Sequence, residues 1–116
     1  MYVSYGSTID GLWTAEFGSS TGVFGGGVVV FQNGKVMGGD AGYYYLGDYR
    51  LTEGALVATI EISAFIKGFE SVFNTVGQNL KLNLVGSIVD ETHVIAQGHP
   101  EQMPNLRLGV KLTKRS

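Results

Sequence analysis

The two histidines are the residues of this chain with the clearest potential for chemistry, because imidazole binds metals and transfers protons near neutral pH. His93 lies close to Glu91 in the sequence, and His99 lies close to Glu101. A metal site needs several converging ligands, and nothing in these spacings makes the two pairs converge. We therefore interpret both histidines as surface or loop residues and expect no metal site.

Two further stretches have the composition of a catalytic or phosphate-binding site. Ser19, Ser20 and Thr21 supply hydroxyl groups, but no neighbouring histidine or Gly-x-Ser-x-Gly frame activates them. Residues 25–27 are consecutive glycines, and a phosphate loop needs its glycines to open a helix. Here they enter a valine-rich strand, which favours a sharply bent strand. We therefore expect no enzyme activity and no cofactor.

The elements that would position these residues read as short strands. Residues 28–31 form a β-branched and aromatic run, and Asn33 and Gly34 suit a two-residue type I′ hairpin turn. Residues 35–37 start the return strand, and residues 38–40 end or bend it. The tyrosines at 43–45 open a third strand, because aromatic rings fit a pleated surface. This stretch therefore predicts a β-meander.

Alternation of apolar and polar residues predicts the other strands. They cover residues 12–17, 55–63, 80–88, 92–98 and 106–113, with connections at 51–54, a turn at 90–91 and a loop at 99–105. The loop is expected because Pro100 and Pro104 lack a ladder donor. Residues 64–78 have spacings that fit a short helical turn or an irregular crossover.

Composition limits the class of protein. A chain of 116 residues makes one domain, and its 18 glycines are more than twice the usual share of about 7%. There is no cysteine, and the net charge of −2 argues against direct nucleic-acid binding. No apolar run approaches the roughly 18 residues that span a bilayer. We predict a flexible leader at 1–9, a single domain at 10–116, no membrane association and a cytoplasmic location.

These elements predict an all-β fold, a mostly antiparallel barrel of about eight strands with one helical or irregular crossover. Closure is expected because it removes exposed strand edges; an open two-sheet sandwich is the alternative. The lumen of such a barrel holds side chains or one small ligand. Candidate cavity residues are the rings of Trp13, Phe17, Tyr43 and Tyr45.

Residues 10–62 resemble the GrlR-like negative regulators of bacterial type III secretion. The resemblance rests on the order and spacing of short motifs: Asp10-Gly11-Leu12-Trp13, Gly25-x-Gly27 before the valines, Asn33-Gly34, Gly38-Gly39-Asp40 and Tyr45-x-Gly47. It implies a lipocalin-like eight-stranded barrel. It also implies a cytoplasmic, non-enzymatic protein that binds a transcriptional activator, restrains virulence-gene expression and forms a homodimer.

The sequence departs from this family at one place. The family prototype engages its activator through an exposed acidic run, where this chain has Leu51-Thr52-Glu53-Gly54 with one acidic residue. The candidate protein-binding residues are therefore the charges on the loops flanking the third and fourth strands: Asp40, Asp48, Arg50 and Glu53. Ordinary solvated turn charges are the alternative interpretation.

Two functions follow from the sequence. The first is a regulator that binds a protein partner through these charges. The second is a carrier of a small lipophilic ligand in the barrel lumen. A lumen filled by side chains would oppose the carrier, and a large apolar void would support it.

Overall fold

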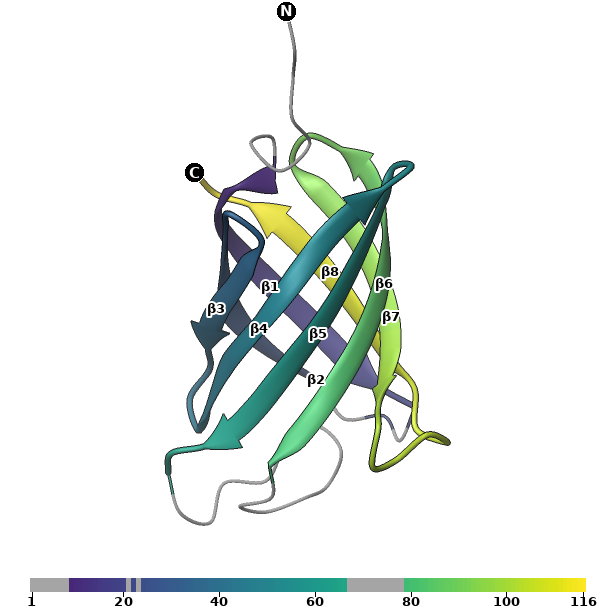
Figure 1. The fold of residues 1–116 in the computed structure, drawn as a ribbon. Helices are drawn as coiled ribbons and strands as arrows, with labels where there is room; N and C mark the ends of the chain where they lie inside the picture. Colours follow the sequence, from purple (N-terminus) through teal and green to yellow (C-terminus); the bar gives the residue numbers. More distant parts are fainter. Residues whose placement is uncertain (1–8, 21, 23, 67–78) are drawn as a thin grey trace, which may run out of the picture.

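The computed structural model describes residues 9–20, 22, 24–66 and 79–116, which form one closed barrel (Figure 1). Each strand pairs antiparallel with the next in sequence, and β8 pairs with β1. The strands are β1 (Gly11–Ser19), β2 (Phe24–Gln32), β3 (Lys35–Gly39), β4 (Tyr43–Thr52), β5 (Ala55–Ala64), β6 (Leu80–Asp90), β7 (His93–Pro100) and β8 (Leu108–Lys114). The predicted eight-stranded antiparallel barrel is confirmed, and the open sandwich is wrong.

The alternation in the sequence assigns the inner and outer faces of the strands correctly. In β1, Trp13 and Ala15 are buried while Glu16 is exposed, and in β5 Leu56 and Ala58 are buried. Because successive side chains in a strand point to opposite faces, these residues form a single apolar core inside the barrel. The free energy released by burying this inner face is the main driving force for closure.

Two tight turns fix the register of neighbouring hairpins. Asn33 and Gly34 have φ angles of +50° and +82°, and the flanking residues Gln32 and Lys35 pair with each other. This confirms the predicted two-residue turn, which needs positive φ at both positions. Glu53 and Gly54 repeat the pattern, with φ of +51° and +80°.

The predicted connection at 51–54 is therefore too long. Leu51 and Thr52 belong to β4 and pair with Leu56 and Ala55 of β5. Only the two positive-φ residues that follow them form the turn.

The predicted loop at 99–105 begins too early. His99 and Pro100 belong to β7, where they pair with Asn83 and Leu82. Pro100 is the last residue of the strand and is fully buried, so its ring adds to the core where the ladder ends. The turn before β7 is at 91–92 rather than 90–91, because Asp90 still pairs with His93. The last strand begins at Leu108, two residues later than expected at 106.

Two predictions fall at the limits of the described residues. The helical turn expected within 64–78 lies mostly on residues 67–78, outside the described residues. Of the leader expected at 1–9, only Ile9 is described, and it is 4% exposed within the core. The packed domain therefore includes Ile9.

The barrel has two distinct ends. The turn end carries the turns at 33–34, 53–54 and 91–92, and the loop end carries the connections at 40–42 and 101–107 (Figure 1). At the turn end, Phe31 makes edge-to-face contacts with both Trp13 and Tyr49, at centroid distances of 5.9 and 5.2 Å. The Trp13 indole Nε1 donates a 2.8 Å hydrogen bond to the carbonyl oxygen of Ile9. These three rings, called here the aromatic plug, close the turn end.

Candidate ligand cavity

An apolar cavity of about 260 Å³ occupies the barrel between the aromatic plug and the loop end. Phe31 of the plug lines it at one end, and Asp40 and Ala41 line it at the other. Apolar side chains from the inner faces of the barrel form most of the wall: Ala15, Phe17, Val29, Leu56, Ala58, Ile60, Ile62, Leu80, Leu82, Leu84, Leu108, Val110 and Leu112.

Small residues leave this space unfilled. An eight-stranded barrel is just wide enough for its own side chains to fill the interior. Here Ala15, Ala58 and the glycines at 25 and 26 line the cavity in place of larger residues. Protein interiors are otherwise packed as densely as organic crystals, so a void of this volume is a specific feature of the barrel.

The polar side chains among the described cavity residues gather at the loop end. They are Asp40, Tyr43 and Tyr45. Oδ1 of Asp40 accepts hydrogen bonds of 3.0 Å from the backbone N–H groups of Gly42 and Tyr43. Oδ2 accepts a short hydrogen bond from the Tyr45 hydroxyl. A half-buried carboxylate is thus held in place beside the apolar cavity.

The surroundings of Tyr45 keep its hydroxyl protonated. Burial raises its pKa far above the usual value, and the hydrogen bond to Asp40 and the negative charge of Asp40 add to the effect. Gly27 makes room for this hydroxyl, because a Cβ at Gly27 would lie 2.9 Å from Tyr45 Oη and 2.8 Å from the Gly39 carbonyl oxygen. The pair of Asp40 and Tyr45 therefore depends on a glycine in β2, which β3 separates from β4.

The structure places three of the four predicted cavity residues at the cavity. Phe17, Tyr43 and Tyr45 line it, whereas Trp13 is 1% exposed within the aromatic plug and does not. Asp40 also lines the cavity, although its place in the sequence had suggested a protein-binding residue. Its position just before two inward-facing tyrosines is the signal that could have identified it.

The predicted protein-binding residues do not form one surface. Asp40 precedes β4 at the loop end, and Glu53 follows β4 at the turn end. The intervening ten-residue strand rises about 3.3 Å per residue, so roughly 30 Å separates them. Asp48 and Arg50 lie on the exposed outer face of β4 rather than in a loop. The prediction that these four charges share the loops flanking the strands is therefore wrong.

Asp48 is also paired within the chain. Its Oδ1 lies 2.7 Å from Lys35 Nζ, and both side chains are about 70% exposed, at 71% and 67%. Exposed ion pairs of this kind contribute only about 0–1 kcal/mol to stability. The pair therefore leaves the outer face of β4 accessible to a partner at little energetic cost.

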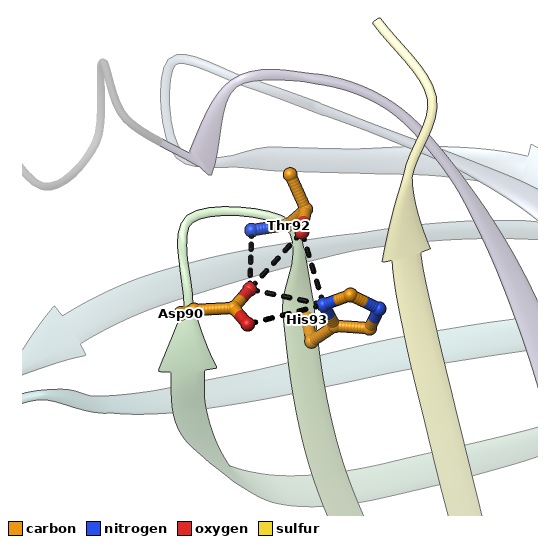
Figure 2. A network of polar contacts seen from close by, with 3 residues as sticks. All are labelled: Asp90, Thr92 and His93. Atoms are coloured by element: carbon orange, nitrogen blue, oxygen red, sulfur yellow. Dashed lines mark hydrogen bonds and ion pairs between the residues drawn. The ribbon is translucent and has the colours of Figure 1, made fainter.

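Asp90, Thr92 and His93 form a polar network at the turn end (Figure 2). Oδ1 of Asp90 accepts hydrogen bonds from Thr92 N at 2.8 Å and Thr92 Oγ1 at 3.0 Å. His93 Nδ1 lies 3.0 Å from that oxygen and 2.9 Å from Thr92 Oγ1. The Thr92 backbone N–H, followed by the hydrogen bond to His93, lowers the pKa of Asp90.

This network does not have the geometry of a catalytic triad. A triad places the carboxylate on one ring nitrogen of histidine and the nucleophile on the other. Here both the Asp90 carboxylate and the Thr92 hydroxyl contact Nδ1 of His93 (Figure 2). The arrangement is that of a side chain that stabilises the turn between β6 and β7.

His99 lies on the exposed outer face of β7. Within the described residues, no group of three histidine, aspartate or glutamate side chains is placed to hold a metal ion. The same part of the chain contains no helix that is long and apolar enough to cross a membrane.

Comparison with known proteins supports the fold only. No family model and no curated protein matches the chain. Among solved structures, the chain is similar to a redesigned β-barrel, with 11% sequence identity and a TM-score of 0.52 over 96% of this chain and 95% of that one. At this identity the similarity establishes a shared barrel architecture and carries no information about function.

Proposed function

We propose that this protein is a non-enzymatic carrier that binds one small lipophilic molecule inside its barrel. The observation that supports the proposal is the apolar cavity of about 260 Å³ between the aromatic plug and the loop end. An engineered apolar cavity of about 150 Å³ stays dry and binds benzene. A larger cavity with a similar lining therefore suits a somewhat larger hydrocarbon.

The cavity also has the composition of a ligand site. Small-molecule pockets are mostly apolar and contain a few placed polar groups that fix the orientation of the ligand. Here a leucine- and valine-rich wall meets the Asp40–Tyr45 pair at one end. Phe24, which lines the cavity and is 82% exposed, connects its lining to the surface of the barrel.

Titration with the fluorescent probe N-phenyl-1-naphthylamine tests the proposal. We expect saturable binding with a blue-shifted emission, because the probe enters an apolar environment. Ala58→Phe should abolish binding, because Ala58 is 3% exposed and lines the cavity. Val85→Phe is the matched control, because Val85 is 57% exposed on the outer face of the neighbouring strand β6. Equal binding by both variants would place the probe outside the barrel and contradict the proposal.

A second candidate function is the regulation of type III secretion through binding of a transcriptional activator. The resemblance of residues 10–62 to the GrlR-like regulators supports it, together with an apolar strip on the outer face of β1–β4. The strip consists of residues that are neighbours in the ladder: Leu12, Val30, Met37 and Leu46. Leu46 is 51% exposed, and Asp48 and Arg50 follow it on the same face of β4.

An apolar centre with a charged edge is the usual composition of a protein interface. Contiguous apolar side chains on an outer face, here with Leu12, Met37 and Leu46 exposed, mark interaction sites. We therefore propose the outer face of β1–β4 as the activator-binding surface of this second function.

Reporter expression from type III secretion promoters tests this second function. Overproduction of the protein should lower expression, and Leu46→Lys should relieve the effect. Asp48→Lys should relieve it partly, because acidic charges steer a basic partner and affect the rate of association more than the affinity. A dimer of the purified protein in sedimentation that Leu46→Lys dissociates would identify a second copy of the chain as the occupant of the strip. Unchanged repression by Leu46→Lys would remove the strip from the proposal.

A further inference from the structure

We propose that the ligand of the cavity has a hydrogen-bond donor, a hydroxyl or an amine, at one end of an apolar body and has no acid group. This inference rests on the proposed carrier function and specifies the chemistry that the loop end of the cavity selects.

The hydrogen bonds of Asp40 identify its side chain as an acceptor. Its two oxygens receive hydrogen from two backbone N–H groups, of Gly42 and Tyr43, and from the Tyr45 hydroxyl. All three partners are donors, which is the pattern of an ionised carboxylate, since ionised aspartate only accepts. A negative charge therefore lies at the loop end of the cavity.

The Tyr45 hydroxyl also offers an acceptor to the cavity. Its only hydrogen is donated to Asp40 Oδ2, so the lone pairs of the phenolic oxygen remain for a ligand. One Asp40 oxygen, Oδ2, receives a single hydrogen bond and can accept another. A ligand hydroxyl or ammonium group would pair with these oxygens, because both types of group donate.

A ligand with an acid group would bind unfavourably at the loop end of the cavity. The described residues that line the cavity include no lysine, arginine or histidine to neutralise a second negative charge. Like charges that share one site disfavour each other. A fatty-acid carboxylate would also leave its own oxygens facing acceptors, and an unpaired buried polar group is unfavourable.

A chain-matched series measured at neutral pH tests the inference: 1-decanol, decylamine and decanoate compete with N-phenyl-1-naphthylamine for the wild-type protein. We expect decanol and decylamine to displace the probe and decanoate to bind at least about tenfold more weakly than decanol. The three compounds share one apolar body, so differences between them report on the head group alone.

Variants at the loop end locate the selectivity. Asp40→Asn removes the charge and keeps a similar shape, so decanoate should approach the affinity of decanol and decylamine should bind more weakly. Tyr45→Phe removes the phenolic acceptor and should weaken decanol. Tyr44→Phe is the matched control, because it removes a hydroxyl from the exposed outer face of the same strand and should leave the order of the three ligands unchanged.

The outcomes separate this inference from the proposed function. Absence of binding by the probe and by all three compounds would overturn the carrier function itself. Decanoate binding as tightly as decanol would overturn the inference and leave the carrier function in place. The wild-type series decides between these outcomes even if a variant fails to fold.

Discussion

The Tyr49 hydroxyl donates a 2.6 Å hydrogen bond to Oδ1 of Asp10, a residue 39 positions earlier in the chain. Asp10 also accepts the backbone N–H of Asn33, at 3.3 Å from each carboxylate oxygen. One carboxylate thus connects the residue before β1, the first hairpin turn and the middle of β4. Because Tyr49 also packs on Phe31, this polar contact supports the aromatic plug that closes the cavity.

Tyr49→Phe keeps the ring and removes this hydrogen bond. We expect it to lower the free energy of unfolding by about 1.5–3 kcal/mol, the range for hydrogen bonds to charged groups. Urea denaturation of Tyr49→Phe, Asp10→Ala and the double variant measures the coupling between the two residues. If the effects of the single changes simply add, the two side chains do not stabilise each other and the proposed support of the plug is wrong.

Stability should fall at alkaline pH as Tyr49 ionises. Burial, followed by the hydrogen bond to Asp10, raises the pKa of Tyr49 to about 12 from its ordinary value of 10.0. A raised folded-state pKa contributes stability that is fully present below pH 10 and is lost as the pH rises toward 12. The urea midpoint should therefore decrease between these values, and the decrease should be smaller in Tyr49→Phe. Tyrosinate absorbance gives an independent readout, because Tyr49→Phe should lose an ionisation step near pH 12.

Gly34 should not tolerate a β-branched residue. Its φ of +82° is a left-handed conformation that costs a residue with a Cβ about 1–2 kcal/mol. Gly34→Val should lower the denaturation midpoint accordingly, whereas Asn33→Gly at the neighbouring positive-φ position should not. No Cβ clash explains the difference, since the closest atom to a Cβ at Gly34 is the Tyr49 carbonyl oxygen at 3.8 Å. An unchanged midpoint for Gly34→Val would remove backbone strain as the reason for glycine here.

The barrel could be predicted from the sequence because its signals are local. Alternation in residues such as Leu56, Ala58 and Ile60 identifies the inner face, and Asn33-Gly34 identifies a turn type. Closure then follows from the number of strands. The predicted end of β7 was less accurate. Pro100 lacks a backbone N–H donor and so indicated a loop from residue 99, but a proline is tolerated as the last residue of a strand.

The cavity depends on relationships that no local pattern records. Its volume is the difference between the barrel interior and the side chains of all eight strands, so neither Ala15 nor Ala58 reveals it when read alone in the sequence. In the sequence, Asp40 has the pattern of a solvated turn charge. Its hydrogen bond to the Tyr45 hydroxyl is visible only in the folded structure. Trp13 also faces the barrel interior, but its ring packs in the aromatic plug and does not line the cavity.

Gly27 should be essential for the loop end of the cavity, and Gly26 should not. A Cβ at Gly27 would meet the Gly39 carbonyl oxygen at 2.8 Å and Tyr45 Oη at 2.9 Å, whereas at Gly26 the nearest atom is the Ala15 carbonyl oxygen at 3.4 Å. Gly27→Ala must therefore displace Tyr45 or the backbone of β3. We expect a loss of about 1–3 kcal/mol in the free energy of unfolding, the usual effect of overpacking.

Two measurements separate the glycine variants. Urea denaturation should show a lower midpoint for Gly27→Ala and little change for Gly26→Ala, the matched control in the same strand. Alkaline titration followed by tyrosinate absorbance should show Tyr45 ionising at lower pH in Gly27→Ala, because burial is the largest cause of its raised pKa. If the two variants behave alike in both measurements, Gly27 does not position the Tyr45 hydroxyl against Asp40, and the selectivity proposed for the cavity loses its structural support.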